Sequence, residues 1–141
     1  MQLDQILSDF EFIDEWEDRY RYIIELGNQL PPYPEVNKTE ATKVKGCVSQ
    51  VWLSFKREKT EGGQEQIHLT GDSDAHIVRG LMAIVFSIFS GKTPQEILGT
   101  DVQKIFENLE LKDHISPQRS NGLNAMVQRI QQEAATLSTA S

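Results

Sequence analysis

The segment from Ala75 to Ser90 constrains the fold of this chain more than any other part of the sequence. Read as a helix, it carries apolar side chains on nearly every side, and these are Ile77, Val78, Leu81, Met82, Ile84, Val85, Phe86, Ile88 and Phe89. Such a helix must be surrounded by other elements, because a helix at a protein surface keeps one polar face. Its most apolar run, residues 81–89, is far shorter than the ~20 residues that span a bilayer, so we expect a core helix.

After Val48 the spacing of apolar residues changes to a period of two, which is typical of a half-buried strand. The pair Gly62-Gly63 supplies a turn, and the segments on either side of it therefore predict a β-hairpin. A short edge strand at residues 43–45 can be added, which predicts a small antiparallel sheet of about three strands. The alternating apolar positions are Val51, Leu53, Phe55, Ile67 and Leu69.

Helical spacing recurs on both sides of the hairpin. Residues 3–10 predict a short helix, and residues 16–30 predict a longer one that ends at Pro31, because proline lacks an N–H donor. After the central helix, further helices are predicted to open at Thr93-Pro94, at Asp101 and at Ser116-Pro117. Helices packed against a small sheet give an α+β fold. We expect a single domain over residues 1–141, with a small polar tail that frays from about residue 134.

The acidic pair Asp72 and Asp74 stands just before the central helix, and we expect these carboxylates to supply its N-cap oxygens. The three histidines, His68, His76 and His114, are scattered among different predicted elements. A structural zinc site needs four Cys or His ligands at short paired spacings, and this sequence lacks them. No metal site is therefore expected.

The charge balance limits the partners that suit this chain. Its formal net charge of −7 argues against binding to nucleic acid or to an anionic membrane surface. One cysteine forms no intramolecular disulfide, and the N-terminal stretch has no apolar run typical of a signal peptide. We therefore expect a cytoplasmic protein, present as a monomer or weak homodimer.

Cys47, in the stretch KVKGCVSQVW, is the one residue whose chemistry raises a functional question. A lone cysteine is often a small buried side chain, and an interaction module with an inert cysteine is one alternative. Lys43 and Lys45 favour the nucleophilic thiolate, and Gly46 places the thiol at a predicted turn. On these residues alone, an inert buried cysteine and a reactive thiolate are equally supported.

A reactive Cys47 is compatible with two kinds of chemistry. A Cys–His hydrolase or transferase would use His68 or His76 with Asp72 or Asp74, although spacing alone cannot establish such a contact. A disulfide oxidoreductase would need a second thiol, which the sequence lacks. A thiol without a partner in its own chain best suits a carrier of a transferred group.

Four blocks of the sequence resemble the SufE-type sulfur acceptor proteins. They are WEDRYRYIIELGNQLP, KVKGCVSQVW, HLTGDSDAHIVRGLMAIV and ISPQRSNGLNAMVQRI, in the order found in that family. The resemblance implies a SufE/NifU-like fold and a pyridoxal-phosphate cysteine desulfurase as partner, with no cofactor in this chain. It implies that Cys47 takes sulfur as a persulfide and passes it to an iron–sulfur scaffold complex. It also implies a loop that shields this cysteine until the partner binds.

The same resemblance points to supporting residues around Cys47. Gln50 and Trp52 match the motif beside the cysteine, and on a strand they would share one face, where they would otherwise serve sheet packing. Arg119 matches the arginine of the S-P-x-R-S block, as part of the contact surface or as a local helix cap. Lys43, Lys45 and Gly46 complete the set of predicted site residues, through thiolate stabilisation and loop movement.

Overall fold

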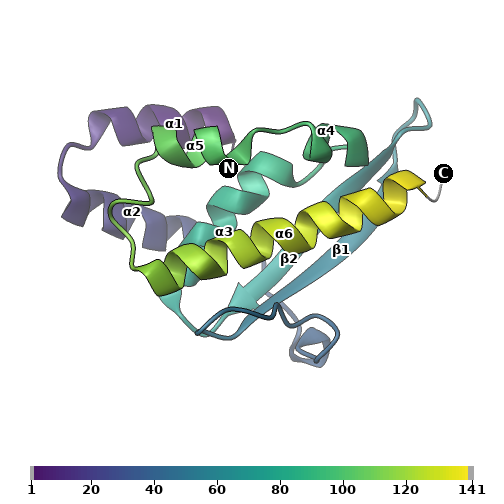
Figure 1. The fold of residues 1–141 in the computed structure, drawn as a ribbon, viewed down its shortest axis with the longest axis horizontal. Coiled ribbons are helices and arrows are strands. Elements are labelled where there is room, and N and C mark those ends of the chain that lie inside the picture. The colour runs from purple at the N-terminus through teal and green to yellow at the C-terminus, as the bar shows by residue number, and fades with distance from the viewer. Residues whose placement is uncertain (1, 140–141) are drawn as a thin grey trace.

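The central helix of this fold is α3 (His76–Phe89), and a computed structural model describes its surroundings for residues 2–139. It contacts α1 (Leu3–Phe12), α2 (Trp16–Asn28), α6 (Pro117–Thr139) and strand β2 (Glu65–Ser73). All nine of the apolar residues singled out in the sequence are buried. The prediction of a core helix is therefore confirmed, and the fold is α+β (Figure 1).

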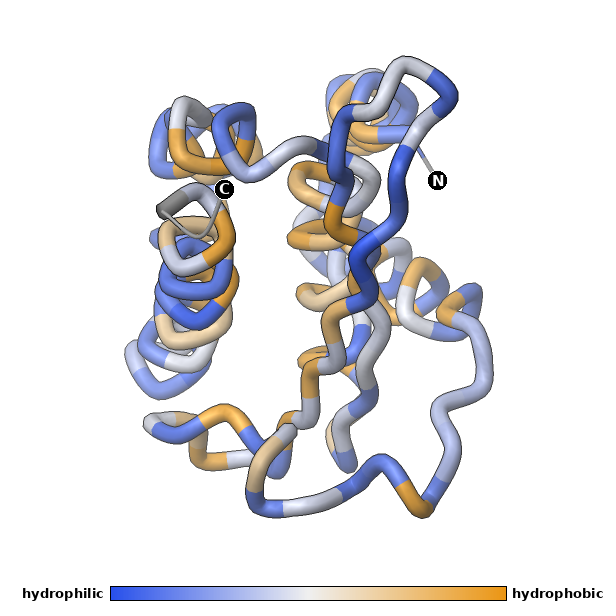
Figure 2. Tube along the Cα trace, turned by 90° about the vertical axis from the view of Figure 1, so that its right-hand side faces the viewer, coloured by the Kyte–Doolittle hydropathy of each residue, from blue (hydrophilic) through white to orange (hydrophobic). Residues whose placement is uncertain are grey.

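The sheet is a single antiparallel hairpin. Strand β1 (Val51–Lys59) pairs with β2 from Val51↔Ser73 to Lys59↔Glu65. The side chains of Val51 and Leu53 are buried beneath it, together with those of Ile67 and Leu69 on β2. In Figure 1 the long helix α6 crosses one side of this hairpin, and in Figure 2 α6 turns its apolar side toward the other elements.

The predicted third strand is reduced to an isolated bridge, so the described part of the chain holds a two-stranded sheet. Lys43 bridges Trp52, and the adjacent Val44 N–H donates to the Val51 carbonyl at 2.8 Å. The chain then leaves the sheet edge, because Gly46 turns with a φ of 90°. A residue in that conformation cannot continue a strand, so the pairing ends after one bridge.

The capping of the helices agrees with the sequence in part. Thr93 and Glu96 form the reciprocal capping box that opens α4 (Pro94–Leu98), and Asp101 caps α5 (Val102–Asn108). The prediction that Asp72 and Asp74 cap α3 is wrong, because the N-cap residue is Ala75, which has no capping side chain, and its N–H donates to the Ser73 hydroxyl at 3.2 Å. Both carboxylates have other partners instead, described below.

The end of α6 is more ordered than predicted. The helix continues to Thr139, and the side chains of Ala134 and Leu137 are buried. Fraying from residue 134 was predicted from small and polar composition, but two apolar positions one turn apart are enough to anchor these last turns. Residues 140–141 lie outside the described part of the chain.

The connection between α2 and β1 is irregular, apart from the short 3-10 helix η1 (Glu35–Asn37). It is tied to the hairpin by the Tyr33 hydroxyl, 2.6 Å from the Ser54 hydroxyl, and by the Lys38 ammonium, 3.2 Å from Asp72. Between residues 2 and 139, no helix combines the length and the apolar character needed to cross a bilayer.

Candidate functional site

Cys47 lies at the tip of a loop whose two ends are fixed to the sheet. At the incoming end, Val44 bonds to Val51 as described above. At the outgoing end, the Gln50 N–H donates to Asp74 Oδ1 at 3.1 Å, and the Asp74 N–H donates back to the Gln50 carbonyl at 3.3 Å. The reciprocal pair holds the base of the loop beside the start of α3.

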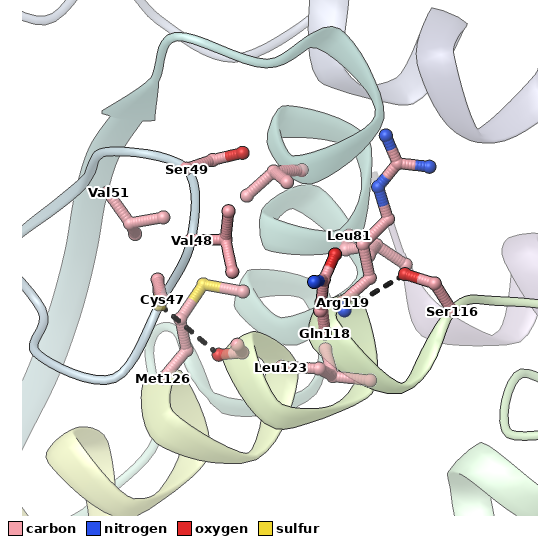
Figure 3. Close-up of a pocket in the computed structure, with 12 residues that line it drawn as sticks. Cys47, Val48, Ser49, Val51, Leu81, Ser116, Gln118, Arg119, Leu123 and Met126 are labelled. Carbon is pink, nitrogen blue, oxygen red and sulfur yellow. Dashed lines mark hydrogen bonds between the residues drawn. The ribbon is translucent and has the colours of Figure 1, made fainter.

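The Cys47 thiol is half-buried against the first turns of α6 (Figure 3). Its S–H donates to the Gly122 carbonyl, with 3.7 Å between the sulfur and the oxygen. Burial raises the pKa of this thiol above its ordinary value, because removal from water disfavours the charged form. In this conformation the side chain is therefore a protonated thiol at neutral pH.

A cavity of about 290 Å³ opens beside the thiol. Its floor is apolar and comes from β1, α3 and α6, whereas its rim carries polar side chains from the start of α6 (Figure 3). The residues that line it are Cys47, Val48, Ser49, Val51, Val78, Leu81, Ser116, Gln118, Arg119, Gly122, Leu123 and Met126. A cavity that combines apolar side chains with a few convergent polar groups is typical of a binding site.

Arg119 is the one predicted supporting residue, besides Cys47 itself, that the structure brings to this cavity. Its backbone N–H donates to the Ser116 hydroxyl at 3.2 Å, and its Nη1 donates to the Tyr20 hydroxyl at 3.1 Å. In Figure 3 the guanidinium points away from Cys47, so the residue belongs to the rim and does not contact the thiol. Both the local cap and a surface role predicted for it are compatible with this position.

The two lysines do not act on the thiol in this conformation. The Lys45 ammonium is 3.0 Å from Glu40, and Lys43 and Lys45 together lower the pKa of that carboxyl. Neither lysine lines the cavity. The expectation that they favour the Cys47 thiolate is not met while the loop is closed, because their charge is directed to Glu40 and burial dominates at the sulfur.

Gln50 and Trp52 are also outside the cavity. Gln50 precedes β1 and contributes through its backbone, so the two side chains do not share a strand face as predicted. Trp52 lies on β1, where the Lys38 ammonium stands 5.0 Å from its ring centroid. Its observed contacts serve packing between the hairpin and the connection that precedes it.

Two residues of this site were missed by the sequence analysis. Asp74 was assigned to a helix cap, but it holds the base of the loop. Gly122 received no role, although a glycine inside a helix is unfavourable and could have served as a signal that something approaches closely there. The structure shows that Cys47 is what approaches.

Among residues 2–139, none of the histidines lines the Cys47 cavity, where the general base of a Cys–His enzyme would stand. His114 stacks on Trp16, and His68 Nε2 is 3.2 Å from Glu58. The Cys47 S–H donates to a carbonyl oxygen, which is too weakly basic to take the thiol proton as a general base. Residues 2–139 also contain no cluster of three or more His, Cys, Asp or Glu side chains that could hold a metal ion.

Comparison with known proteins extends these observations. Residues 4–134 match the model of the SufE family, described as an Fe-S metabolism associated domain. An uncharacterised SufE-like protein of Rhizobium meliloti is 56% identical over 134 residues, which cover 94% of each chain. A second one, from Rhizobium etli, is 53% identical and covers 94% of this chain and 88% of the relative.

A solved structure supports the fold independently. The solution structure of a hypothetical protein from Thermus thermophilus superimposes with a TM-score of 0.73 at 22% identity, covering 97% of this chain and 96% of the other. The identity is low, so this likeness bears on the fold alone. The family model and the two Rhizobium relatives span nearly the whole sequence, and the chain accordingly belongs to the SufE family of proteins associated with iron–sulfur metabolism.

Proposed function

We propose that this protein accepts sulfur from a pyridoxal-phosphate cysteine desulfurase on Cys47, stimulates that enzyme by doing so, and delivers the sulfur to an iron–sulfur scaffold. The observation that carries the proposal is the position of Cys47, the lone thiol of the chain, at the tip of a loop whose base is held by backbone hydrogen bonds. Membership of a family associated with iron–sulfur metabolism supports it. The reducing cytoplasm suits a protein that works through a free thiol.

The proposed transfer is an exchange between two sulfur centres. The Cys47 thiolate attacks the outer sulfur of a persulfide held on the desulfurase cysteine. A new sulfur–sulfur bond forms on Cys47 while the old one breaks, and the desulfurase cysteine leaves as a thiolate. No external oxidant or reductant is needed, because one sulfane sulfur moves between two thiols. Cys47 then carries a persulfide that a thiolate of the scaffold can attack in the same way.

The loop must open for this exchange. The closed thiol faces Gly122 and is half-buried, and burial raises its pKa, so it is less accessible and less readily ionised than an exposed thiol. Val48, the next residue, is 76% exposed and presents an apolar side chain to any surface that approaches the loop tip. Opening with the base retained would deliver Cys47 and Val48 together into a partner's active site.

The test is mass spectrometry of the protein after incubation with a cysteine desulfurase and free cysteine. We expect wild-type protein to gain the mass of one sulfur atom, lost again on reduction, and to raise the desulfurase turnover rate. Cys47→Ser is expected to gain none and to leave turnover at its basal value, with an unchanged circular dichroism spectrum as the control for folding.

The burial of Cys47 favours one alternative, an interaction module whose cysteine is inert. That alternative predicts a desulfurase stimulated as strongly by Cys47→Ser as by wild type. Such a result, or wild-type protein that gains no sulfur, would show that the carrier mechanism is wrong.

A further inference from the structure

The tip of the Cys47 loop rests on two small residues of α6, Gly122 and Ala125, which we call the α6 seat. A Cβ added to Gly122 would lie 3.5 Å from the Cys47 sulfur and 3.8 Å from the Cys47 Cβ. A Cβ added to Gly46 would lie 3.6 Å from the Ala125 Cβ. The loop and the helix therefore meet at contact distance along one face of α6, with no large side chain between them.

The hydrogen bond in the seat depends on the proton of the thiol. The Cys47 S–H donates to the Gly122 carbonyl oxygen, which has no proton to give in return. An anionic sulfur in the same place would face this oxygen and the apolar floor of the cavity without a donor. Burial of an unpaired charge is strongly unfavourable, so the seat suits a neutral sulfur and not a charged one.

The charged groups nearest the sulfur do not offset this preference in the closed loop. Arg119 is the charged side chain among the described residues that line the cavity, and its guanidinium points away from Cys47 (Figure 3). On the loop side, Lys43 and Lys45 act on Glu40. Asp74 accepts from the backbone at the base of the loop, and α3 faces the cavity with apolar side chains.

We propose that Gly122 and Ala125 are positioning residues for the sulfur transfer proposed above, holding the Cys47 sulfur as a neutral thiol and releasing it as an anion. The nucleophilic thiolate is then also the form that leaves the cavity. A persulfide is a stronger acid than its parent thiol, so loading with sulfur shifts the loop toward the open state in which the next acceptor can reach it. The significance for transfer rests on the proposed function, whereas the charge selectivity of the seat does not.

The experiment uses a matched pair of variants, Cys47→Asp and Cys47→Asn, which differ in charge and hardly in shape. The readout is the nuclear Overhauser effect between the Gly46 α-protons and the Ala125 methyl, which reports the closed loop directly. At neutral pH we expect wild type and Cys47→Asn to show it and Cys47→Asp to lose at least about nine-tenths of its intensity, because the carboxylate is expelled from the seat.

A pH titration tests the same point on the natural side chain. The closed-state pKa of the thiol is raised, so closing is favoured below the ordinary thiol pKa of about 8.5 and weakens as pH rises above it. The ratio of closed to open loops should fall about tenfold per pH unit until the closed-state pKa is reached. Cys47→Ser, which keeps a donor and does not ionise in this range, should keep its signal.

Three outcomes would overturn the proposal: a signal retained in Cys47→Asp, a signal lost equally in Cys47→Asn, or a pH dependence that persists in Cys47→Ser. None of the variants carries sulfur, so these measurements stand apart from the transfer assay. If the protein accepts no sulfur but shows the expected signals, the charge selectivity of the α6 seat stands and the proposed function is wrong. If it accepts sulfur but lacks these signals, the proposed function stands and the proposal about the seat is wrong.

Discussion

The contact between α2 and α3 and the contact between the Cys47 loop and α6 both involve glycine, and they differ in how closely the neighbouring atoms approach. Between α2 and α3, a Cβ on Gly27 would lie 2.6 Å from the Gly80 nitrogen, and a Cβ on Gly80 would lie 2.6 Å from the carbonyl carbon of Ile23. Between the Cys47 loop and α6, a Cβ on Gly122 would lie 3.5 Å from the thiol sulfur, an ordinary contact distance. No side chain fits the first contact, whereas the second has room beside it.

The difference separates a permanent contact from one that can open. The α2–α3 contact is buried with Ile23 and Leu26 in the core, and separating the helices would expose apolar surface on both. The loop contact borders a cavity of about 290 Å³ and is closed by one sulfur hydrogen bond. Opening of the loop would break this bond without separating α2 from α3, so the loop can move while those helices stay packed.

The sharpest test of the permanent contact is Gly80→Ala. The added methyl would meet the α2 backbone, which cannot move aside as a flexible side chain does. We expect a loss of about 3 kcal/mol in the free energy of unfolding, measured by urea denaturation. Gly62→Ala in the hairpin turn is the matched control, since its Cβ would lie 3.8 Å from the Thr60 hydroxyl, and it should change stability by less than about 0.5 kcal/mol. Equal effects of the two substitutions would contradict this account of the α2–α3 contact.

Gly122→Leu tests whether the loop contact can be opened without harm to the fold. The leucine should occupy the cavity and displace Cys47, so that iodoacetamide alkylates the thiol about tenfold faster at neutral pH. The free energy of unfolding should stay within about 1 kcal/mol of wild type, because leucine is the better helix former.

Asn121→Leu adds the same side chain at an exposed position of α6 and should leave the alkylation rate unchanged. A Gly122→Leu protein that unfolds, or one whose thiol reacts no faster than in wild type, would mean that the seat is as permanent as the α2–α3 contact.

Asp74 offers a smaller perturbation at the base of the same loop. Removing its bond to the Gln50 N–H in Asp74→Ala should raise the alkylation rate of Cys47 about fivefold, the value of one modest hydrogen bond. Asp74→Asn keeps an acceptor oxygen and should remain nearer to wild type. If both variants react at the wild-type rate, the base of the loop does not contribute to closure.

The fold followed closely from the sequence wherever the pattern was local. Three correct predictions depend on residues close together in the chain. They are the apolar sides of α3, the period-two hairpin and the helix that opens at Thr93-Pro94. The predicted third strand is only an isolated bridge, because Gly46 turns the chain away from the sheet edge. The last turns of α6 are helical where fraying was predicted, because Leu137 is buried by elements far away in the sequence.

The candidate site divides in the same way. Cys47 and its placement at a turn were read from the sequence, and Arg119 from the family resemblance. The partners of Lys45 and Asp74 could not be read from the sequence. Lys45 pairs with Glu40 and Asp74 accepts from the Gln50 backbone, and both contacts depend on the path of irregular segments. Local charge near Cys47 thus suggested a thiolate, while the packing around the sulfur gives a protonated thiol.

The sequence by itself determined the family, the central helix and the residue proposed to accept sulfur, because these are written in side-chain type and spacing. The tertiary structure decided the state of that residue. The Cys47 sulfur lies against the carbonyl of Gly122, 75 residues away in the chain, and burial there raises the pKa of the thiol above its ordinary value. No local pattern encodes such a contact. A candidate nucleophile was legible in the sequence, but its half-buried position against Gly122 exists only once α6 has packed beneath the loop.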